Sequence, residues 1–399
     1  MKSIIIAIGL FALTAAAVAF YPTARDNVPQ VVQQPPPISR VPPVEAPKIE
    51  VVFVLDTTGS MSELIQAAKD KIWSIASTMV SAQPAPEIKI GLVAYRDRGD
   101  AYVTKVVDLS DDLDSVYASL IDFEADGGGD GPESVNQALY DAVHEISWSQ
   151  DPNSYQVVFL VGDAPPHMDY QDDVKYPVVL AEAARRGIVV NTIRCGTDSN
   201  TEAAWRSIAA ATQGAFFSVA QSGGAIAMGT PYDTKIAELS AGLDATRLYY
   251  GNVTERAEKQ LKILATDKFH AKASDATKAR RAAFNLLSSG EKNQFGDGDL
   301  VGAVTSGVVK LDEIETEDLP ISLQAMTPEE RNEVVRANSA ERDALKRQIR
   351  ELSSLRADYL ESEVAAIDDI DESLDYQIFE TVRGQAEKKG LKYSASPKY

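Results

Sequence analysis

An oxygen-rich loop, Asp56-Thr57-Thr58-Gly59-Ser60, follows directly after an apolar run of the sequence. Asp56 offers a carboxylate, and Thr58 and Ser60 each offer a hydroxyl. Hard oxygen donors of this kind suit Mg²⁺, Mn²⁺ or Ca²⁺ and do not suit zinc or copper. The loop therefore predicts a site for a hard divalent cation. The alternative is an ordinary strand-to-helix turn in which a Thr or Ser caps the next helix.

Two later loops carry further carboxylates. The first, residues 127–133, reads Gly-Gly-Gly-Asp-Gly-Pro-Glu, and within it Asp130 is the preferred ligand and Glu133 the alternative. The second begins at Asp163, directly after the apolar run Val157 to Val161. Such acids can also cap helices or solvate turns. Three carboxylates in one crevice would however repel one another unless a cation lay between them, which favours a metal site.

The elements around these loops alternate between strand and helix signals. We expect strands at 49–55, 88–95, 102–107, 155–162, 188–194 and 215–219, and helices at 62–82, 111–121, 133–147, 174–186 and 201–212. This alternation predicts an α/β fold with a doubly wound, mostly parallel six-stranded sheet, in which 102–107 is an antiparallel edge strand. Open sheets of this type bind ligands at the carboxyl ends of their strands, where the three loops emerge.

The motifs resemble those of von Willebrand factor A domains. Asp-x-Thr-Gly-Ser at Asp56 is similar to the family's Asp-x-Ser-x-Ser, with Thr58 as a conservative departure, and Asp163 matches the second aspartate of the family's metal-ion-dependent adhesion site. The Gly-Gly-Gly-Asp-x-Pro-Glu loop resembles that of an exported bacterial branch, where many other members have a Thr ligand. The resemblance covers about 48–222.

This resemblance implies a Rossmann-like fold and a function in protein binding. The implied metal ligands are Asp56, Thr58, Ser60, Asp130 and Asp163. The ion would be Mg²⁺, with Mn²⁺ or Ca²⁺ as alternatives, and a partner protein's acidic side chain would fill its open coordination position. We expect no enzyme activity from such a domain. Two alternatives stay open: a metal-dependent hydrolase, and a scaffold in which the ion only braces the loops.

The N-terminus indicates export. Met1-Lys2 precedes the apolar run Ile4 to Phe20, which ends in an Ala-Val-Ala cleavage-like sequence. Residues 1–20 are therefore a signal peptide or, alternatively, an uncleaved membrane anchor, and residues 21–47 are a Pro-rich spacer. Both interpretations place the rest of the chain in the periplasm, in the cell envelope or outside the cell.

Composition excludes several other functions. The formal net charge of -20 argues against nucleic-acid binding. The single cysteine, Cys195, excludes an internal disulfide and is expected to be a small buried residue. The Arg98-Gly99-Asp100 triplet is expected to form a tight turn, and His167 an exposed loop residue. Neither a phosphate-binding Gly-rich loop nor a nucleophile elbow occurs, and no kinase domain is recognisable.

The C-terminal part is predicted to be mainly helical. We expect helices at 234–243, 253–264 and 276–287 and a small strand pair within 300–311, so that 223–311 forms one region and 312–399 an acidic tail. In the tail, Leu345, Ile349, Leu352 and Tyr359 form an apolar seam that resembles a short coiled coil. This seam either packs on the preceding helices or pairs with a second copy. The last residues, 388–399, are expected to be frayed.

Overall fold

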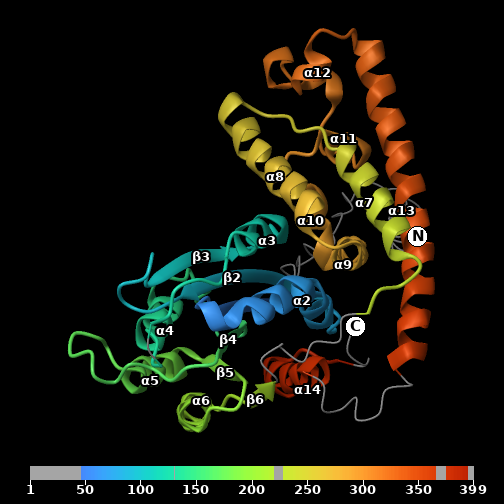
Figure 1. Ribbon diagram of the computed structural model, residues 1–399. Helices are drawn as coiled ribbons and strands as arrows, with labels where there is room; N and C mark the ends of the chain where they lie inside the picture. Colours follow the sequence, from blue (N-terminus) through green and yellow to red (C-terminus); the bar gives the residue numbers. More distant parts are fainter. Residues whose placement is uncertain (1–45, 130, 220–227, 365–373, 394–399) are drawn as a thin grey trace, which may run out of the picture. The chain divides into compact units, whose positions relative to one another are not determined.

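A six-stranded sheet lies at the centre of the first half of the chain (Figure 1). The computed structural model describes residues 46–129, 131–219, 228–364 and 374–393. The strands are β1 (Lys48–Asp56), β2 (Glu87–Tyr95), β3 (Thr104–Ser110), β4 (Tyr155–Gly162), β5 (Ile188–Cys195) and β6 (Phe216–Val219), in the order β3-β2-β1-β4-β5-β6. All pairings are parallel except that of β2 with β3. The predicted fold class is confirmed.

Both faces of the sheet are covered by helices, which explains the nearly continuous apolar sequence of β1. Val51, Phe53 and Leu55 belong to the core on one face, and Val52 and Val54 to the core on the other. The first face is covered by α2 (Ser62–Val80) and α3 (Leu113–Ile121), and the second by α4 (Val135–His144), α5 (Tyr176–Arg186) and α6 (Ser199–Ala211) (Figure 1).

The register brings the carboxyl ends of the central strands to one edge of the sheet. Asp56 at the end of β1 pairs with Tyr95 at the end of β2. On the other side, Leu55 of β1 pairs with Val161 of β4. The loops that follow these three strands therefore emerge side by side, as the strand–helix alternation predicts.

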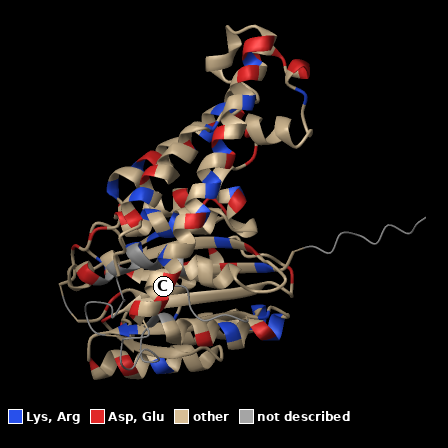
Figure 2. Ribbon diagram, turned by 90° about the vertical axis from the view of Figure 1, so that its right-hand side faces the viewer, with Lys and Arg blue, Asp and Glu red and all other residues tan. Residues whose placement is uncertain are grey.

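A helical region follows β6. Its elements are α7 (Asp233–Ala245), α8 (Val253–Lys272), α9 (Asp275–Asn285), η2 (Ser288–Gly290), α10 (Glu291–Phe295), α11 (Leu300–Thr305), η3 (Leu311–Glu313), η4 (Thr316–Asp318), α12 (Ile321–Gln324) and the long α13 (Pro328–Val364). Lys and Arg residues are interspersed with Asp and Glu residues along the ribbon of these helices (Figure 2). Leu345, Ile349 and Leu352 of α13 pack into one core with α7 and α9, so the predicted apolar seam is used within the chain.

The last α-helix, α14 (Leu374–Ala386), packs against the sheet domain. Its side chains Ile378, Phe379 and Val382 belong to the same core as β1 and α2. Beyond it, Lys392 forms an antiparallel backbone bridge with Gln83. The expectation of a frayed end is therefore wrong for residues 391–393, while 394–399 lie outside the described residues.

One predicted element is wrong in type. The segment 300–311 was expected to form a strand pair, but α11 occupies Leu300–Thr305. The Asp299 side chain accepts a hydrogen bond from the Gly302 backbone N–H at 2.8 Å and so caps this helix. Helix capping and packing outweigh the β propensity of its valines here. The edge strand is also shifted, from the expected 102–107 to Thr104–Ser110.

The predicted N-terminal signal or anchor and most of the Pro-rich spacer fall in residues 1–45, outside the described residues. Among the helices that the structure describes, none is long and apolar enough to cross a membrane. The domain boundaries proposed at 222 and 311 stay predictions.

Candidate metal centre

The loop after β1 places its oxygen donors around a buried carboxylate. Asp56 is fully buried, and its Oδ1 accepts hydrogen bonds from the Thr58 backbone N–H at 2.9 Å and the Thr58 hydroxyl at 2.6 Å. The Thr58 hydroxyl lies 3.5 Å from that of Ser60. The other oxygen of Asp56, Oδ2, has no hydrogen-bond partner among the described residues. Burying a carboxylate oxygen costs free energy unless a positive charge or a hydrogen-bond donor lies next to it.

The loop after β4 faces the same space. Asp163 lies in the wall of an open cleft of about 530 Å³, together with Thr58, Ser60 and Glu133. The backbone carbonyl of Asp163 accepts a hydrogen bond from the Thr201 hydroxyl of α6 at 2.9 Å, which fixes the start of the loop. The structure thus brings the first and the last of the predicted loops together at one cleft.

In the loop before α4, the predicted ligand Asp130 lies outside the described residues. Glu133 is 3% exposed, and its Oε2 has no hydrogen-bond partner among the described residues. A Cβ on Gly128, whose φ is +82°, would lie 3.3 Å from Thr58 Cβ and 3.6 Å from Glu133 Oε1. Glu133 therefore lies close to the loop that follows β1. Among the described residues, it is the acidic ligand candidate from the loop before α4.

Burial and mutual repulsion raise the pKa values of two carboxyl groups at the candidate site. Burial, with a smaller contribution from the neighbouring Asp163 charge, raises the pKa of Asp56 from 3.8 to about 7, although hydrogen bonds from Thr58 act against this rise. Burial and the charge of Asp56 likewise raise the pKa of Glu133 to about 9. The surroundings of these carboxyl groups disfavour their ionised forms. A bound cation would stabilise the ionised carboxylates, so the site is suited to one.

The donor set fits a hard divalent cation through a mixture of carboxylates and hydroxyls. Across the described ranges, no group of three or more His, Cys, Asp or Glu side chains is arranged to hold a metal ion. The described candidates Asp56, Thr58, Ser60 and Asp163 include only two acids, so an ion here would depend on the hydroxyls as well. That combination suits Mg²⁺, Mn²⁺ or Ca²⁺.

The segment after β2 contributes contacts that the sequence interpretation missed. Arg96 donates from Nε to the Thr57 carbonyl at 3.1 Å and from Nη2 to the Glu124 carbonyl at 2.7 Å. Asp100 accepts a hydrogen bond from the Gly128 backbone N–H at 3.1 Å. The sequence pattern predicts only a tight turn for this segment. The signal for more was the unusual density of charged residues in Tyr95-Arg96-Asp97-Arg98-Gly99-Asp100.

Two single-residue expectations have different outcomes. His167 is 4% exposed and stacks on Tyr170 at 4.0 Å between ring centroids, so the expectation of an exposed loop histidine is wrong. Its position is set by tertiary contacts of the loop, which local sequence does not reveal. Cys195 is buried, as expected, and burial raises the pKa of its thiol above the usual range.

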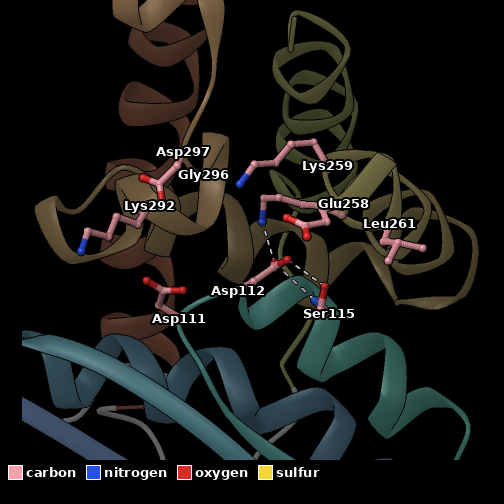
Figure 3. A pocket seen from close by; sticks show the side chains of 10 residues that line it. Asp111, Asp112, Ser115, Glu258, Lys259, Leu261, Lys292, Gly296 and Asp297 are labelled. Atoms are coloured by element: carbon pink, nitrogen blue, oxygen red, sulfur yellow. Dashed lines mark hydrogen bonds and ion pairs between the residues drawn. The ribbon is translucent and has the colours of Figure 1, made fainter. Parts of the chain in front are cut away.

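A second cavity lies between α3, α8 and α10 (Figure 3). It measures about 170 Å³ and is lined by both acids and lysines. Lys262 Nζ lies 2.6 Å from Asp112 Oδ1, and the Asp112 carboxylate also accepts a hydrogen bond from the Ser115 hydroxyl at 2.7 Å. Because the buried Lys262 of α8 is paired with Asp112 at the start of α3, we interpret this cavity as part of the contact between the sheet domain and the helical region.

The fold and the cleft define a class of protein: a doubly wound α/β domain with carboxylate and hydroxyl donors at the carboxyl edge of its sheet. Residues 50–230 match the family model described as von Willebrand factor A domain. This part of the chain therefore carries a von Willebrand factor A domain, a module that often binds proteins in a metal-dependent way.

The curated relatives match this chain over about 120 residues. von Willebrand factor A domain-containing protein 7 of Rattus norvegicus is 38% identical over 120 residues, which are 30% of this chain and 12% of that protein. Alpha-protein kinase vwkA of Dictyostelium discoideum is 28% identical over 120 residues, which are 30% of this chain and 19% of the kinase. The chain thus spans less than a fifth of the length of these relatives.

Solved structures with a similar fold include proximal thread matrix protein 1 from the mussel byssus, with a zinc-occupied metal-ion-dependent adhesion site. It is 18% identical, with a TM-score of 0.35, and the match covers 43% of this chain and 42% of that one. The SpRpn10 von Willebrand factor A domain is 13% identical, with a TM-score of 0.34, covering 44% of this chain and 89% of that domain.

Proposed function

We propose that this protein binds a partner protein through a divalent cation held at the cleft between the loops that follow β1 and β4. The observation that carries the proposal is the buried Asp56 carboxylate, whose Oδ2 has no hydrogen-bond partner among the described residues, while Thr58 and Ser60 of the same loop line an open cleft. An ion would complete the coordination of this group, and the open side of the cleft would leave room for a partner's oxygen.

The chain's own residues would hold the ion by their oxygen atoms. Asp56 and Asp163 would supply carboxylates, and Thr58 and Ser60 hydroxyls. From the loop before α4 we keep both Asp130 and Glu133 as ligand candidates. The burial of Glu133 beside Thr58 favours Glu133. When bound, the ion supplies a positive charge to which an acidic side chain of the partner can bind. We propose Mg²⁺ as the resident ion, with Mn²⁺ or Ca²⁺ as alternatives.

We further propose an extracytoplasmic location in the periplasm, in the cell envelope or outside the cell. The support is the charged tip, apolar run and Ala-Val-Ala sequence of residues 1–20, which is typical of a signal peptide or anchor. An anchor would place the protein at a membrane. Self-association through α13 is a second proposal, supported by Leu355, which is exposed on this long helix.

The experiment is a calorimetric titration of the cation-free full chain with Mg²⁺, Mn²⁺, Ca²⁺ and Zn²⁺. We expect wild type to bind Mg²⁺ and Asp56→Ala to lose binding at the same concentrations. Asp126→Asn is the matched control. This substitution also removes one carboxylate charge close to the same loops, but the Asp126 side chain is 81% exposed. Equal binding by wild type and Asp56→Ala would contradict the proposal.

A second measurement distinguishes partner binding from a scaffold or a hydrolase. In the Mn²⁺-loaded protein, water-proton relaxation reports whether the ion keeps an exchangeable water. We expect strong relaxation enhancement that acetate at millimolar concentration reduces, because a carboxylate displaces the water. No enhancement would indicate a closed, structural ion. Metal-dependent turnover of a broad panel of esters and peptides, lost in Asp163→Ala, would instead favour the hydrolase.

A further inference from the structure

We propose that Asp97 is a positioning residue of the metal centre: it holds the loops that carry the metal ligands in place without touching the ion. The inference rests on the proposed metal site and adds a residue that the site's motifs do not contain. Asp97 lies in the loop between β2 and β3, is 6% exposed, and does not line the cleft. Its contacts with two other loops carry the argument.

Asp97 binds the loop before α4. The Ser134 hydroxyl donates a hydrogen bond to Asp97 Oδ1 at 2.8 Å, and both side chains are buried. Ser134 directly follows Glu133, the described acidic candidate from this loop. A change in the position of Ser134 would therefore move Glu133 as well.

Asp97 also binds the loop after β4 with its other oxygen. The Tyr170 hydroxyl donates a hydrogen bond to Asp97 Oδ2 at 2.8 Å, and His167 Nε2 lies 3.4 Å from the same atom. The backbone N–H of His167 in turn donates to the Glu133 carbonyl at 3.0 Å. One carboxylate thus joins the two loops that bring Glu133 and Asp163 to the cleft.

The neighbours of Asp97 extend the same set of contacts to the remaining loop. Arg96 Nε donates to the Thr57 carbonyl at 3.1 Å, next to Thr58 in the first metal loop. The Asp97 backbone N–H donates to Asp100 Oδ2 at 3.3 Å, and this carboxylate also accepts from the Gly128 N–H. The segment Arg96 to Asp100 therefore contacts all three loops, with Asp97 at its centre.

Asp97 can hold the loops in place because a buried carboxylate accepts hydrogen bonds in fixed directions. Without it, the buried donors that bind it would lack another acceptor. Residues that orient metal ligands from outside the coordination shell typically change metal affinity about 10–100-fold when mutated. An Asn at position 97 would keep the size of the side chain. It would however replace one acceptor oxygen by an NH₂ donor, so that it could not accept from both Ser134 and Tyr170.

The test measures Mn²⁺ affinity of the full chain by electron paramagnetic resonance, together with the unfolding midpoint of the cation-free protein. We expect Asp97→Asn to weaken Mn²⁺ binding about 10–100-fold. The matched control is Glu50→Gln. Glu50 is also a buried carboxylate, accepting from the Ser149 N–H and from Gln156 Nε2, both at 2.9 Å, but it lies near the opposite end of β1. We expect the control to lower the unfolding midpoint without changing Mn²⁺ affinity.

Two further variants keep the test decisive if Asp97→Asn does not fold. Tyr170→Phe and Ser134→Ala each remove one donor and leave the carboxylate, and each should weaken Mn²⁺ binding less than Asp97→Asn. Combined with Asp97→Asn, Tyr170→Phe should add little, because both act through the same oxygen.

The outcomes separate this inference from the proposed function. If wild type does not bind Mn²⁺, the proposed metal site fails, and this inference fails with it. If wild type binds while the Asp97, Tyr170 and Ser134 variants bind equally well, only the role of Asp97 is overturned. Equal weakening by Asp97→Asn and Glu50→Gln would overturn it too, because the effect would then follow overall stability.

Discussion

Thr58 shows at the scale of one residue how the first loop is organised. Its backbone N–H and its hydroxyl both donate to Asp56 Oδ1, whereas Oδ2 has no hydrogen-bond partner among the residues that the structure describes. The family motif that this sequence resembles has Ser at the corresponding position, and Thr retains the hydroxyl. Thr58 is buried, and there is room for its extra methyl group because the neighbouring Gly128 has no side chain.

The hydroxyl of Thr58 should therefore matter more than its methyl group. We predict that Thr58→Val weakens Mg²⁺ binding about 10-fold or more, because it removes an oxygen donor and a hydrogen bond to Asp56. Thr58→Ser should bind Mg²⁺ within about threefold of wild type. Calorimetric titration measures both. A Thr58→Val variant that binds as tightly as wild type would exclude this hydroxyl from the site.

The helix α14 shows at the scale of an element how a distant segment completes the sheet domain. The Tyr155 hydroxyl of β4 donates to Gln385 Oε1 at 2.7 Å, and Gln385 Nε2 donates to Asn191 Oδ1 of β5 at 2.8 Å. Phe379 and Val382 are buried in the core that also contains Ile49 and Trp73. These contacts explain why the end of the predicted acidic tail packs with the strands.

We predict that Phe379→Ala lowers the free energy of unfolding by about 3–5 kcal/mol, as for other large-to-small changes of a buried aromatic side chain. Leu355→Ala is the control, because Leu355 lies on α13 and is exposed. That change should cost less than about 1 kcal/mol. Urea unfolding followed by circular dichroism measures both values. A small effect of Phe379→Ala would show that α14 does not contribute to the stability of the sheet domain.

At the scale of the whole molecule, a buried charge network joins the sheet domain to the helical region. Arg281 of α9 is fully buried, and it donates from Nε to Asp114 of α3 at 2.6 Å and from Nη1 to Asp244 of α7 at 2.8 Å. Burial alone would raise the pKa of both carboxyls, but Arg281 and the other basic groups around them, Arg247 among them, together outweigh it. The pKa of Asp244 falls to about 2, and that of Asp114 lies well below its usual range.

We predict that Arg281→Ala lowers the free energy of unfolding by about 3–5 kcal/mol at pH 7, because it removes the buried cation that binds two buried carboxylates at once. The pKa values of these groups are lower in the folded than in the unfolded protein. Their contribution is therefore present above about pH 4 and is lost as the pH falls towards 2. The difference between wild type and Arg281→Ala should accordingly shrink between about pH 4 and pH 2.

Urea unfolding across this pH range measures the effect. Lys310→Ala serves as the control, because it breaks the exposed pair with Glu313 and should change stability by less than about 0.5 kcal/mol at every pH. A difference between wild type and Arg281→Ala that stays constant with pH would contradict the assignment of the network's stability to the ionised carboxylates.

The sequence by itself determined the alternation of elements, the parallel sheet and the edge of that sheet at which Asp56, Ser60 and Asp163 emerge. These follow from local patterns: apolar runs that end abruptly, helix signals after them, and the rule that parallel strands share one carboxyl edge. Such patterns depend on neighbours a few residues apart, so the chain reveals them directly.

Only the tertiary structure decided how the parts are held together. The contacts of Asp97 with Ser134 and Tyr170, the burial of His167 and the return of α14 to the sheet all join residues far apart in the sequence. In 300–311, a cap and packing on α13 selected a helix where valines suggested strands. These outcomes depend on which surfaces meet when the chain folds, and local residue patterns carry no information about that.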